Sequence, residues 1–295
     1  MHVATQEREE FMRSVLKSYL PALLVASLSL VAASGAPAAD LLDRIKEKGQ
    51  IVIASEARYP PFEYVENGSI VGYGVDLFNE VMKALPGVKI DRLDLPFQGL
   101  LPGLQTEKFD AIITSVTVNK QRYDTYRLSL PIADASFTYV KRKGDSSLKT
   151  PDDLSGKSVG TQAGSAQLKA TEALSEQLKS KGLAPITNIQ TYVDFNEAYA
   201  DLAAGRTDAV VNSLPNLLYL QTQRGDAFET VKTTFGAPTY FSWAFRKDDD
   251  SKSLADFFDD QFRKLAADGT MAKLQEKWFG FTMKLPTDAL PVPKD

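Results

Sequence analysis

The sequence contains no cysteine and a single histidine, His2. The lack of cysteine excludes disulfides, thiolate metal sites, cysteine nucleophiles and a lipid-modified N-terminal cysteine. The single histidine lies at the very N-terminus, which excludes a Ser-His-Asp triad. One histidine also excludes a multi-histidine metal site. Basic and acidic residues number 34 and 38, so there is no broad basic field for nucleic acid. We therefore expect no metal, no cofactor and no nucleic-acid partner, and chemistry that suits binding better than most catalysis.

The N-terminal segment has the features of a secretory signal peptide. Residues 18–39 carry no charge and are rich in leucine and valine, Arg13 and Lys17 precede them, and Ala36-Pro37-Ala38 forms a small-residue cleavage site. A membrane anchor is the alternative, but the stretch holds proline and several serines, whereas a spanning helix needs ~20 strongly apolar residues. We predict that residues 1–38 are removed, and that the mature protein is free in the periplasm. Either Met1 or Met12 is the true start.

Predicted strands and amphipathic helices alternate along the rest of the 295-residue chain. Ile51–Ala54 and Ala111–Ile113 are short apolar runs, as expected of strands buried on both faces. The segment Val75–Leu85, between these two runs, has apolar residues at helical spacing and is predicted to be an amphipathic helix. The alternation predicts an α/β fold with mostly parallel sheets flanked by helices. Further strands are expected at residues 158–160, 189–193, 209–211 and 239–246, and helices at 100–105, 166–181, 195–204, 254–265 and 271–278.

The length and the order of these elements predict two similar α/β lobes. We expect the chain to cross between them near residues 134–140 and 235–241. Lobe 1 would then be discontinuous, with residues 39–135 and 239–295, and lobe 2 would be inserted, with residues 136–238. The proline-containing tail from Leu285 is expected to lie extended on the surface.

The most informative stretch for function follows a predicted buried strand. Thr114, Ser115 and Thr117 come at the end of that strand, and a helix is expected to begin at Asn119 with Arg122 close by. Hydroxyls and amides beside an arginine suit a carboxylate, because the guanidinium offers two parallel charge-assisted hydrogen bonds. The alternative is that Asn119 only caps a helix and Arg122 is solvated.

Other candidate residues lie where loops follow strands. Ser165, after Gly164, could present its amide to the same anion or simply cap a helix. Tyr59, in a proline-rigid turn, and Phe97 could form stacking walls or could pack within their loops. Glu56 follows the first strand and could meet a cation or be solvated.

Several motifs, taken together, resemble those of one protein family. They lie at residues 59–63 (YPPFE), 72–77, 101–105, 108–111, 114–122, 154–160, 204–209 and 277–279 (KWF). The chain resembles the extracellular solute-binding proteins of polar amino-acid ABC importers, similar to the histidine-, glutamine- and lysine/arginine/ornithine-binding ones, over about residues 40–283. The motifs are specific for the family and not for a ligand. The family usually has an acid where this chain has Gly74, at a predicted helix start.

The resemblance implies a two-lobed periplasmic binding protein fold, similar to type II, that closes on its ligand about two hinge crossovers. It also implies ligand roles. Arg122 would clamp the ligand α-carboxylate, helped by Thr117 and the Ser165 amide. Thr114 and Ser115 would contact the α-amino side.

The resemblance further implies that Tyr59 and Phe97 sandwich the apolar part of the ligand. Glu56 sits where some family members place an acid against a basic ligand side chain.

One departure concerns the position that binds the α-ammonium group. Many members have an aspartate there, after the strand that begins at Asp208; this chain has Ser213, preceded by Asn212. A buried ammonium without a carboxylate partner loses a charge-assisted hydrogen bond. Either Glu56 replaces that charge, or the ligand nitrogen is substituted, delocalised or absent. The ligand is then a standard amino acid, or an N-substituted, opine-like or cyclic derivative.

The hypothesis that follows is the substrate-binding component of an ABC importer, without catalysis. We expect a monomer that captures a carboxylate-bearing solute and docks on an inner-membrane permease. The alternative is an enzyme on the same fold, similar to periplasmic cyclohexadienyl dehydratases, for which Glu56 is the candidate general acid. A third alternative is a sensor domain of a larger receptor.

Overall fold

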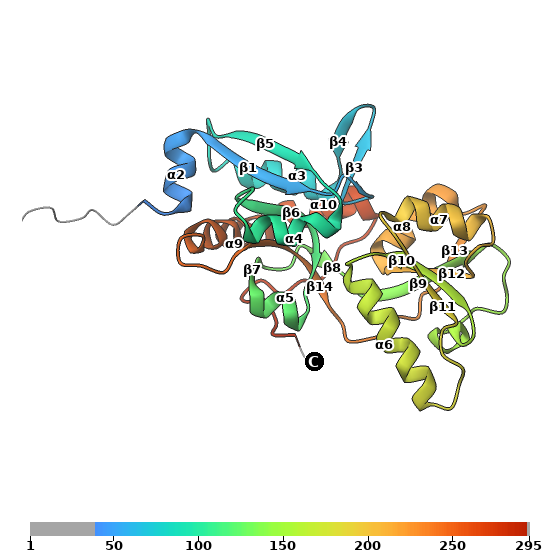
Figure 1. Cartoon of the computed structure of the whole chain (residues 1–295). Coiled ribbons are helices and arrows are strands. Elements are labelled where there is room, and N and C mark those ends of the chain that lie inside the picture. Colours follow the sequence, from blue (N-terminus) through green and yellow to red (C-terminus); the bar gives the residue numbers. More distant parts are fainter. Residues whose placement is uncertain (1–38, 294–295) are drawn as a thin grey trace, which may run out of the picture. The chain divides into compact units, whose positions relative to one another are not determined.

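The structure describes residues 39–293, and the predicted signal peptide, residues 1–38, lies outside this range. Two mixed sheets form the framework of the described residues. The structure is a computed structural model, shown in Figure 1. Its first sheet has the order β5-β1-β6-β14-β7, with β8 also paired to β14. These strands are β1 (Gln50–Ser55), β5 (Lys89–Asp94), β6 (Ala111–Thr117), β7 (Tyr126–Leu128), β8 (Ala133–Asp134) and β14 (Tyr240–Arg246).

The second sheet repeats this arrangement with the order β11-β10-β12-β9-β13. Its strands are β9 (Phe137–Arg142), β10 (Ser158–Gln162), β11 (Asn188–Tyr192), β12 (Ala209–Ser213) and β13 (Phe228–Thr230). In each sheet one strand, β14 or β9, is antiparallel to its neighbours, and the others point the same way. The predicted α/β fold with two mostly parallel sheets is therefore confirmed.

Helices cover both faces of each sheet, and a small sheet of β2 (Arg58–Tyr59), β3 (Glu63–Glu66) and β4 (Ser69–Val71) adjoins the first. In Figure 1, α3, α9 and α10 gather near the first sheet and α6, α7 and α8 near the second. The helices are α2 (Leu41–Lys48), α3 (Tyr73–Met82), α4 (Phe97–Gln105), α5 (Lys120–Thr125), η1 (Pro151–Leu154), α6 (Ala166–Ser180), α7 (Phe195–Ala203), α8 (Leu214–Arg224), α9 (Lys252–Ala267) and α10 (Thr270–Phe279).

Successive side chains of β6 enter different parts of the core, as the two-residue period of a strand requires. Ile113 belongs to the cluster that contains Phe78 of α3 and Phe258 of α9. Ile112 belongs to the cluster that contains Leu100 of α4. All of these side chains are fully buried, and each such burial stabilises the fold by about 1.5–3 kcal/mol.

The two connections between the sheets run side by side. The backbone amide of Ala135 donates to the carbonyl of Thr239, and Phe137 forms an isolated antiparallel bridge with Phe235. The connections lie where the sequence predicts the crossovers. The stated limits of the lobes, 39–135 with 239–295 and 136–238, stay predictions.

Some elements differ from the sequence-based expectation. The strand predicted to begin at Ala111 and to run out into Thr114, Ser115 and Thr117 is regular through Thr117, because β14 pairs with its polar end, Phe241 opposite Thr117. The turn predicted at residues 59–64 contains two short paired strands. Helices α2 and α8 and strands β4, β5, β7, β8, β9 and β13 were not predicted. The tail from Leu285 to residue 293 has neither helix nor strand, as expected.

Candidate functional site

Polar side chains from both sheets meet where parallel strands end. Glu56 follows β1, Thr117 ends β6 and Gln162 ends β10. Ligands of open α/β sheets bind at such carboxyl ends. Together with their neighbours, these residues enclose a cavity of about 10 Å³, which we call the central cavity. It is lined by Glu56, Tyr59, Phe97, Thr114, Ser115, Thr117, Gln162, Ser165 and Gln167.

A carboxyl–amide hydrogen bond closes one side of the central cavity. Gln162 Nε2 donates to Glu56 Oε1 at 2.6 Å and to the backbone carbonyl of Val193 at 3.1 Å. Burial raises the pKa of Glu56 to about 8, against the opposing effect of the Gln162 hydrogen bond. Glu56 therefore carries its proton at neutral pH, so it is a neutral group that joins the first sheet to the second.

A second bridge runs through Tyr59, which packs against Phe195 with ring centroids 5.5 Å apart. The Tyr59 hydroxyl donates to Asn212 Oδ1 at 2.7 Å and accepts from Gln167 Nε2 at 3.1 Å. Gln167 Nε2 also lies 3.1 Å from Ser213 Oγ. Gln167 thus stands between Ser213 and the central cavity.

Arg122 is a buried guanidinium with no acidic partner. Asn119 caps α5 by accepting from the Arg122 amide, which places Arg122 at the first turn. Its Nη1 donates to the carbonyl of Thr117 at 2.9 Å, and its Nη2 to the carbonyl of Gly164 at 3.3 Å. The guanidinium carbon lies 5.2 Å from the centre of the Phe97 ring. No acidic side chain among the described residues lies within 4.0 Å of it.

Desolvation lowers the pKa of Arg122 to about 10, so the group stays charged at neutral pH. The guanidinium borders an opening of about 380 Å³, together with Phe97 and Ser165, which also line the central cavity. A buried cation is costly unless an anion compensates it. A carboxylate entering through this opening would supply that anion.

Two hydroxyls of β6 face the central cavity in different ways. Thr114 Oγ1 donates to Glu63 Oε2 at 2.8 Å, so the hydrogen of this hydroxyl is already bonded within the protein. Burial raises the pKa of Glu63 to about 8, so this carboxyl too is neutral at pH 7. Ser115 Oγ is buried without any hydrogen-bond partner. The Ser115 hydroxyl can therefore bond to a bound molecule.

The structure brings most of the predicted site residues to one place. Those that border the central cavity are Glu56, Tyr59, Phe97, Thr114, Ser115, Thr117 and Ser165. Arg122 borders the adjoining opening, Asn212 borders a separate cavity beyond Tyr59, and Ser213 bonds to Gln167, which lines the central cavity. The Ser165 amide is bonded weakly to the carbonyl of Gln162, at 3.4 Å.

Sequence reasoning missed Gln162 and Gln167. A signal for Gln162 was present, because it lies between the strand predicted at residues 158–160 and the Gly164–helix junction, where ligands of parallel sheets bind. No local signal marks Gln167, since its place depends on how α6 packs against β12. Between residues 39 and 293 no cluster of acidic or histidine side chains could hold a metal ion, and no helix is long and apolar enough to cross a membrane.

Comparison with known proteins identifies the family of the chain. The model of the bacterial extracellular solute-binding proteins, family 3, matches residues 51–281. The chain belongs to this family. It is 34% identical to the probable amino-acid-binding protein YxeM of Bacillus subtilis, over 74% of this chain and 80% of that one.

Solved structures of solute-binding proteins share the fold. The arginine-bound form of truncated ArgBP from T. maritima is 32% identical, with a TM-score of 0.65 over 76% of this chain and 99% of that one. An ancestral amino acid-binding protein, AncCDT-1, described as a precursor of cyclohexadienyl dehydratase, is 28% identical, with a TM-score of 0.71 over 81% and 99%. The chain is therefore a two-lobed solute-binding protein, which confirms the resemblance drawn from its motifs.

Proposed function

We propose that this solute-binding protein is the substrate-binding component of an ABC importer for a carboxylate-bearing amino acid or amino-acid derivative. It works as a monomer in the periplasm after its signal peptide is cleaved. The ligand is captured between the lobes by hinge closure and is then delivered to the membrane permease. The amino-acid-binding descriptions of its relatives support this class of ligand.

The observation that carries the proposal is Arg122, a residue 5% exposed whose guanidinium, among residues 39–293, bonds only to the carbonyl oxygens of Thr117 and Gly164. These two carbonyls come from different lobes, so Arg122 lies at the seam where they meet. A ligand carboxylate there would accept two parallel hydrogen bonds. Water is largely excluded from this position, which strengthens the attraction between the two charges.

Hinge closure follows from the size of the central cavity. A volume of about 10 Å³ corresponds to roughly one water molecule, so an amino acid enters only if the lobes separate. The bonds that then break are those of Glu56 with Gln162 and of Tyr59 with Asn212 and Gln167. A ligand whose polar groups replace these bonds favours reclosure.

The test is Arg122→Ala, with the dissociation constants of amino acids measured by calorimetry. Loss of two charge-assisted bonds is expected to weaken binding on the order of 100-fold or more. The matched control is Arg263→Ala, because Arg263 forms an exposed ion pair with Asp260 away from the site. An unchanged dissociation constant in Arg122→Ala would overturn the carboxylate clamp.

A second candidate function rests on Glu56. Its carboxyl borders the central cavity and is protonated at neutral pH, which are the properties of a general acid. A cyclohexadienyl dehydratase-like activity would use this proton, and the likeness to AncCDT-1 gives it a specific precedent. Turnover of prephenate or arogenate that disappears in Glu56→Gln would establish this function. Binding of amino acids without turnover would exclude it.

A further inference from the structure

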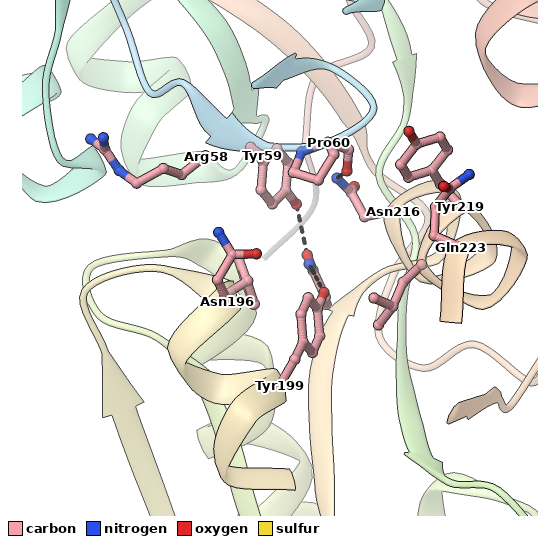
Figure 2. Close-up of a pocket in the computed structure, with 11 residues that line it drawn as sticks. Arg58, Tyr59, Pro60, Asn196, Tyr199, Asn216, Tyr219 and Gln223 are labelled. Carbon is pink, nitrogen blue, oxygen red and sulfur yellow. Dashed lines mark hydrogen bonds between the residues drawn. The ribbon is translucent and has the colours of Figure 1, made fainter. Parts of the chain in front are cut away.

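A second interlobe cavity of about 90 Å³ lies beyond Tyr59, and Figure 2 shows its lining. We call it the tyrosine–amide cavity. Tyr59 borders both this cavity and the central cavity. The dashed lines in Figure 2 mark the bonds from Tyr59 to Asn212, 2.7 Å, and from Asn212 Nδ2 to Tyr199, 2.9 Å. The two cavities are thus separated by a partition of side-chain hydrogen bonds.

Asn216, which lines the tyrosine–amide cavity, has an unused hydrogen-bond acceptor. Its side chain is 3% exposed and lines the cavity, and its Nδ2 donates to the carbonyl of Pro60 at 2.9 Å. Its Oδ1 is buried and has no hydrogen-bond partner. A buried acceptor without a donor is unfavourable, so a molecule that brings a hydroxyl or amide hydrogen to this point gains binding energy.

The charges around the cavity favour an uncharged occupant. Arg58 is the only lysine, arginine, aspartate or glutamate in its lining, and Asp94 already neutralises it at 2.9 Å. Another carboxylate, that of Asp194, lies 4.0 Å from Arg58 Nε. A second carboxylate, as in a dicarboxylate opine, would therefore find no free cation in this cavity.

The position of the cavity relates it to the ligand nitrogen. Asn212, which lines it, is followed by Ser213, and the family resemblance implies that Ser213 stands where many members carry the aspartate that holds the α-ammonium. The opening at Arg122 shares the wall residues Phe97 and Ser165 with the central cavity. The central cavity shares Tyr59 with the tyrosine–amide cavity, so the three spaces adjoin in that order.

We propose, on the basis of the function proposed above, that the tyrosine–amide cavity binds a substituent on the nitrogen of the ligand. The ligand class is an α-amino carboxylate whose nitrogen carries a short, uncharged group that ends in a hydroxyl or a carboxamide. The carboxylate lies at Arg122, and the end of the substituent donates to Asn216 Oδ1. With about 90 Å³, the cavity is smaller than the ~150 Å³ that holds benzene, so the substituent is only a few atoms long.

The test compares three forms of the same parent amino acids, glycine, alanine, glutamine and arginine, by calorimetry. Each is used with a free nitrogen, with an N-ethyl group and with an N-(2-hydroxyethyl) group. The hydroxyethyl form is expected to bind about 10-fold tighter than the ethyl form of nearly equal size, because only it satisfies the Asn216 acceptor. N-carboxymethyl forms are expected to bind no tighter than the ethyl forms.

A pair of variants on α8 checks the location. Leu220 lines the cavity, whereas Leu218 on the same helix does not, and both are half-buried. Leu220→Trp is expected to fill the cavity and remove the preference for the hydroxyethyl form, and Leu218→Trp is expected to keep it. A preference that survives Leu220→Trp, or equal binding of all three forms, would overturn the inference and leave the proposed function intact. Failure of every amino acid and derivative to bind would overturn both.

Discussion

The carboxyl group of Glu63 fills the space that a side chain at Gly74 would need. A Cβ built on Gly74 would lie 1.8 Å from Glu63 Oε1 and 2.9 Å from its Cδ. Glu63 lies on β3, and its carboxyl points at the first turn of α3. Glu63 Oε2 accepts from Thr114, a residue of the central cavity. The Gly74 position is thereby coupled to the wall of the site.

The first prediction is that Gly74→Ala destabilises the protein by about 1–3 kcal/mol, because the new methyl group displaces a fully buried carboxyl. The unfolding free energy from denaturant titration measures this effect. Gly99→Ala is the matched control, since Gly99 also lies in the first turn of a helix and nothing lies within 4 Å of a Cβ there. A smaller loss for Gly74→Ala than for Gly99→Ala would show that Glu63 moves aside freely.

The second prediction concerns pH. The pKa of Glu63 is raised by burial from 4.5 to about 8, so its contribution to stability is fully present below pH 4.5 and is lost as the pH rises towards 8. Glu63→Gln removes this ionisation and keeps an acceptor for Thr114. Its stability is expected to fall less than that of the wild type between pH 5 and 8, by about 1 kcal/mol or more.

Thermal unfolding at each pH measures the difference, and 1 kcal/mol corresponds to roughly 2–4 °C in Tm. Glu66→Gln, an exposed position on the same strand, is the control and is expected to follow the wild type. Burial also raises the pKa of Glu56 to about 8, and Glu56 is present in both variants, so part of the pH dependence of stability persists. If the stability of wild type and Glu63→Gln fell in parallel with pH, the raised pKa of Glu63 would be contradicted.

The fold could be predicted wherever a local pattern decides the structure. The apolar run of β1 and the strand–glycine–helix order around Gly164 needed no tertiary information. For β6 the sequence predicts the apolar start and the hydroxyls at the end, but not the antiparallel partner β14, which lies more than a hundred residues further on. Strands as short as β2 are likewise defined by their partners.

The site shows the same division. Arg122 could be predicted because a helix cap and a row of hydroxyls next to it form a local pattern. The role of Ser213 could not, because Gln167 of α6 lies between it and the central cavity, and only the packing of α6 on β12 brings them together. The unpaired Oδ1 of Asn216 could not be predicted for the same reason, since its burial depends on the Pro60 segment of the other lobe.

The third prediction is that Ser213→Asp increases the affinity for amino acids with a free α-ammonium group by roughly 10-fold, because it restores a charge-assisted partner. It also costs stability in the absence of ligand, since Ser213 is fully buried and a carboxylate there lacks a cation. Ser213→Asn, of similar size and without charge, is the control. Calorimetry with free and N-substituted amino acids measures both effects, and an equal gain for the two ligand types would show that the nitrogen does not lie near Ser213.

The fourth prediction separates stability from lobe closure. Tyr59→Phe keeps the ring that packs on Phe195 and removes the hydroxyl that bonds to Asn212 and Gln167 across the lobes. The loss of these bonds is expected to cost about 1 kcal/mol and to shift the population towards a more open form. Small-angle X-ray scattering should then give a larger radius of gyration than for the wild type.

Tyr73→Phe is the matched control, because the buried Tyr73 hydroxyl donates to the carbonyl of Ile132 at 2.7 Å within the region of the first sheet. This variant is expected to lose a similar amount of stability without any change in the radius of gyration. Equal radii for Tyr59→Phe and the wild type would mean that Tyr59 does not hold the lobes together. Equal expansion of both variants would mean that the effect is a general loosening of the fold, since Tyr59 bonds to side chains of the second sheet and its helices whereas the Tyr73 bond stays within the region of the first sheet.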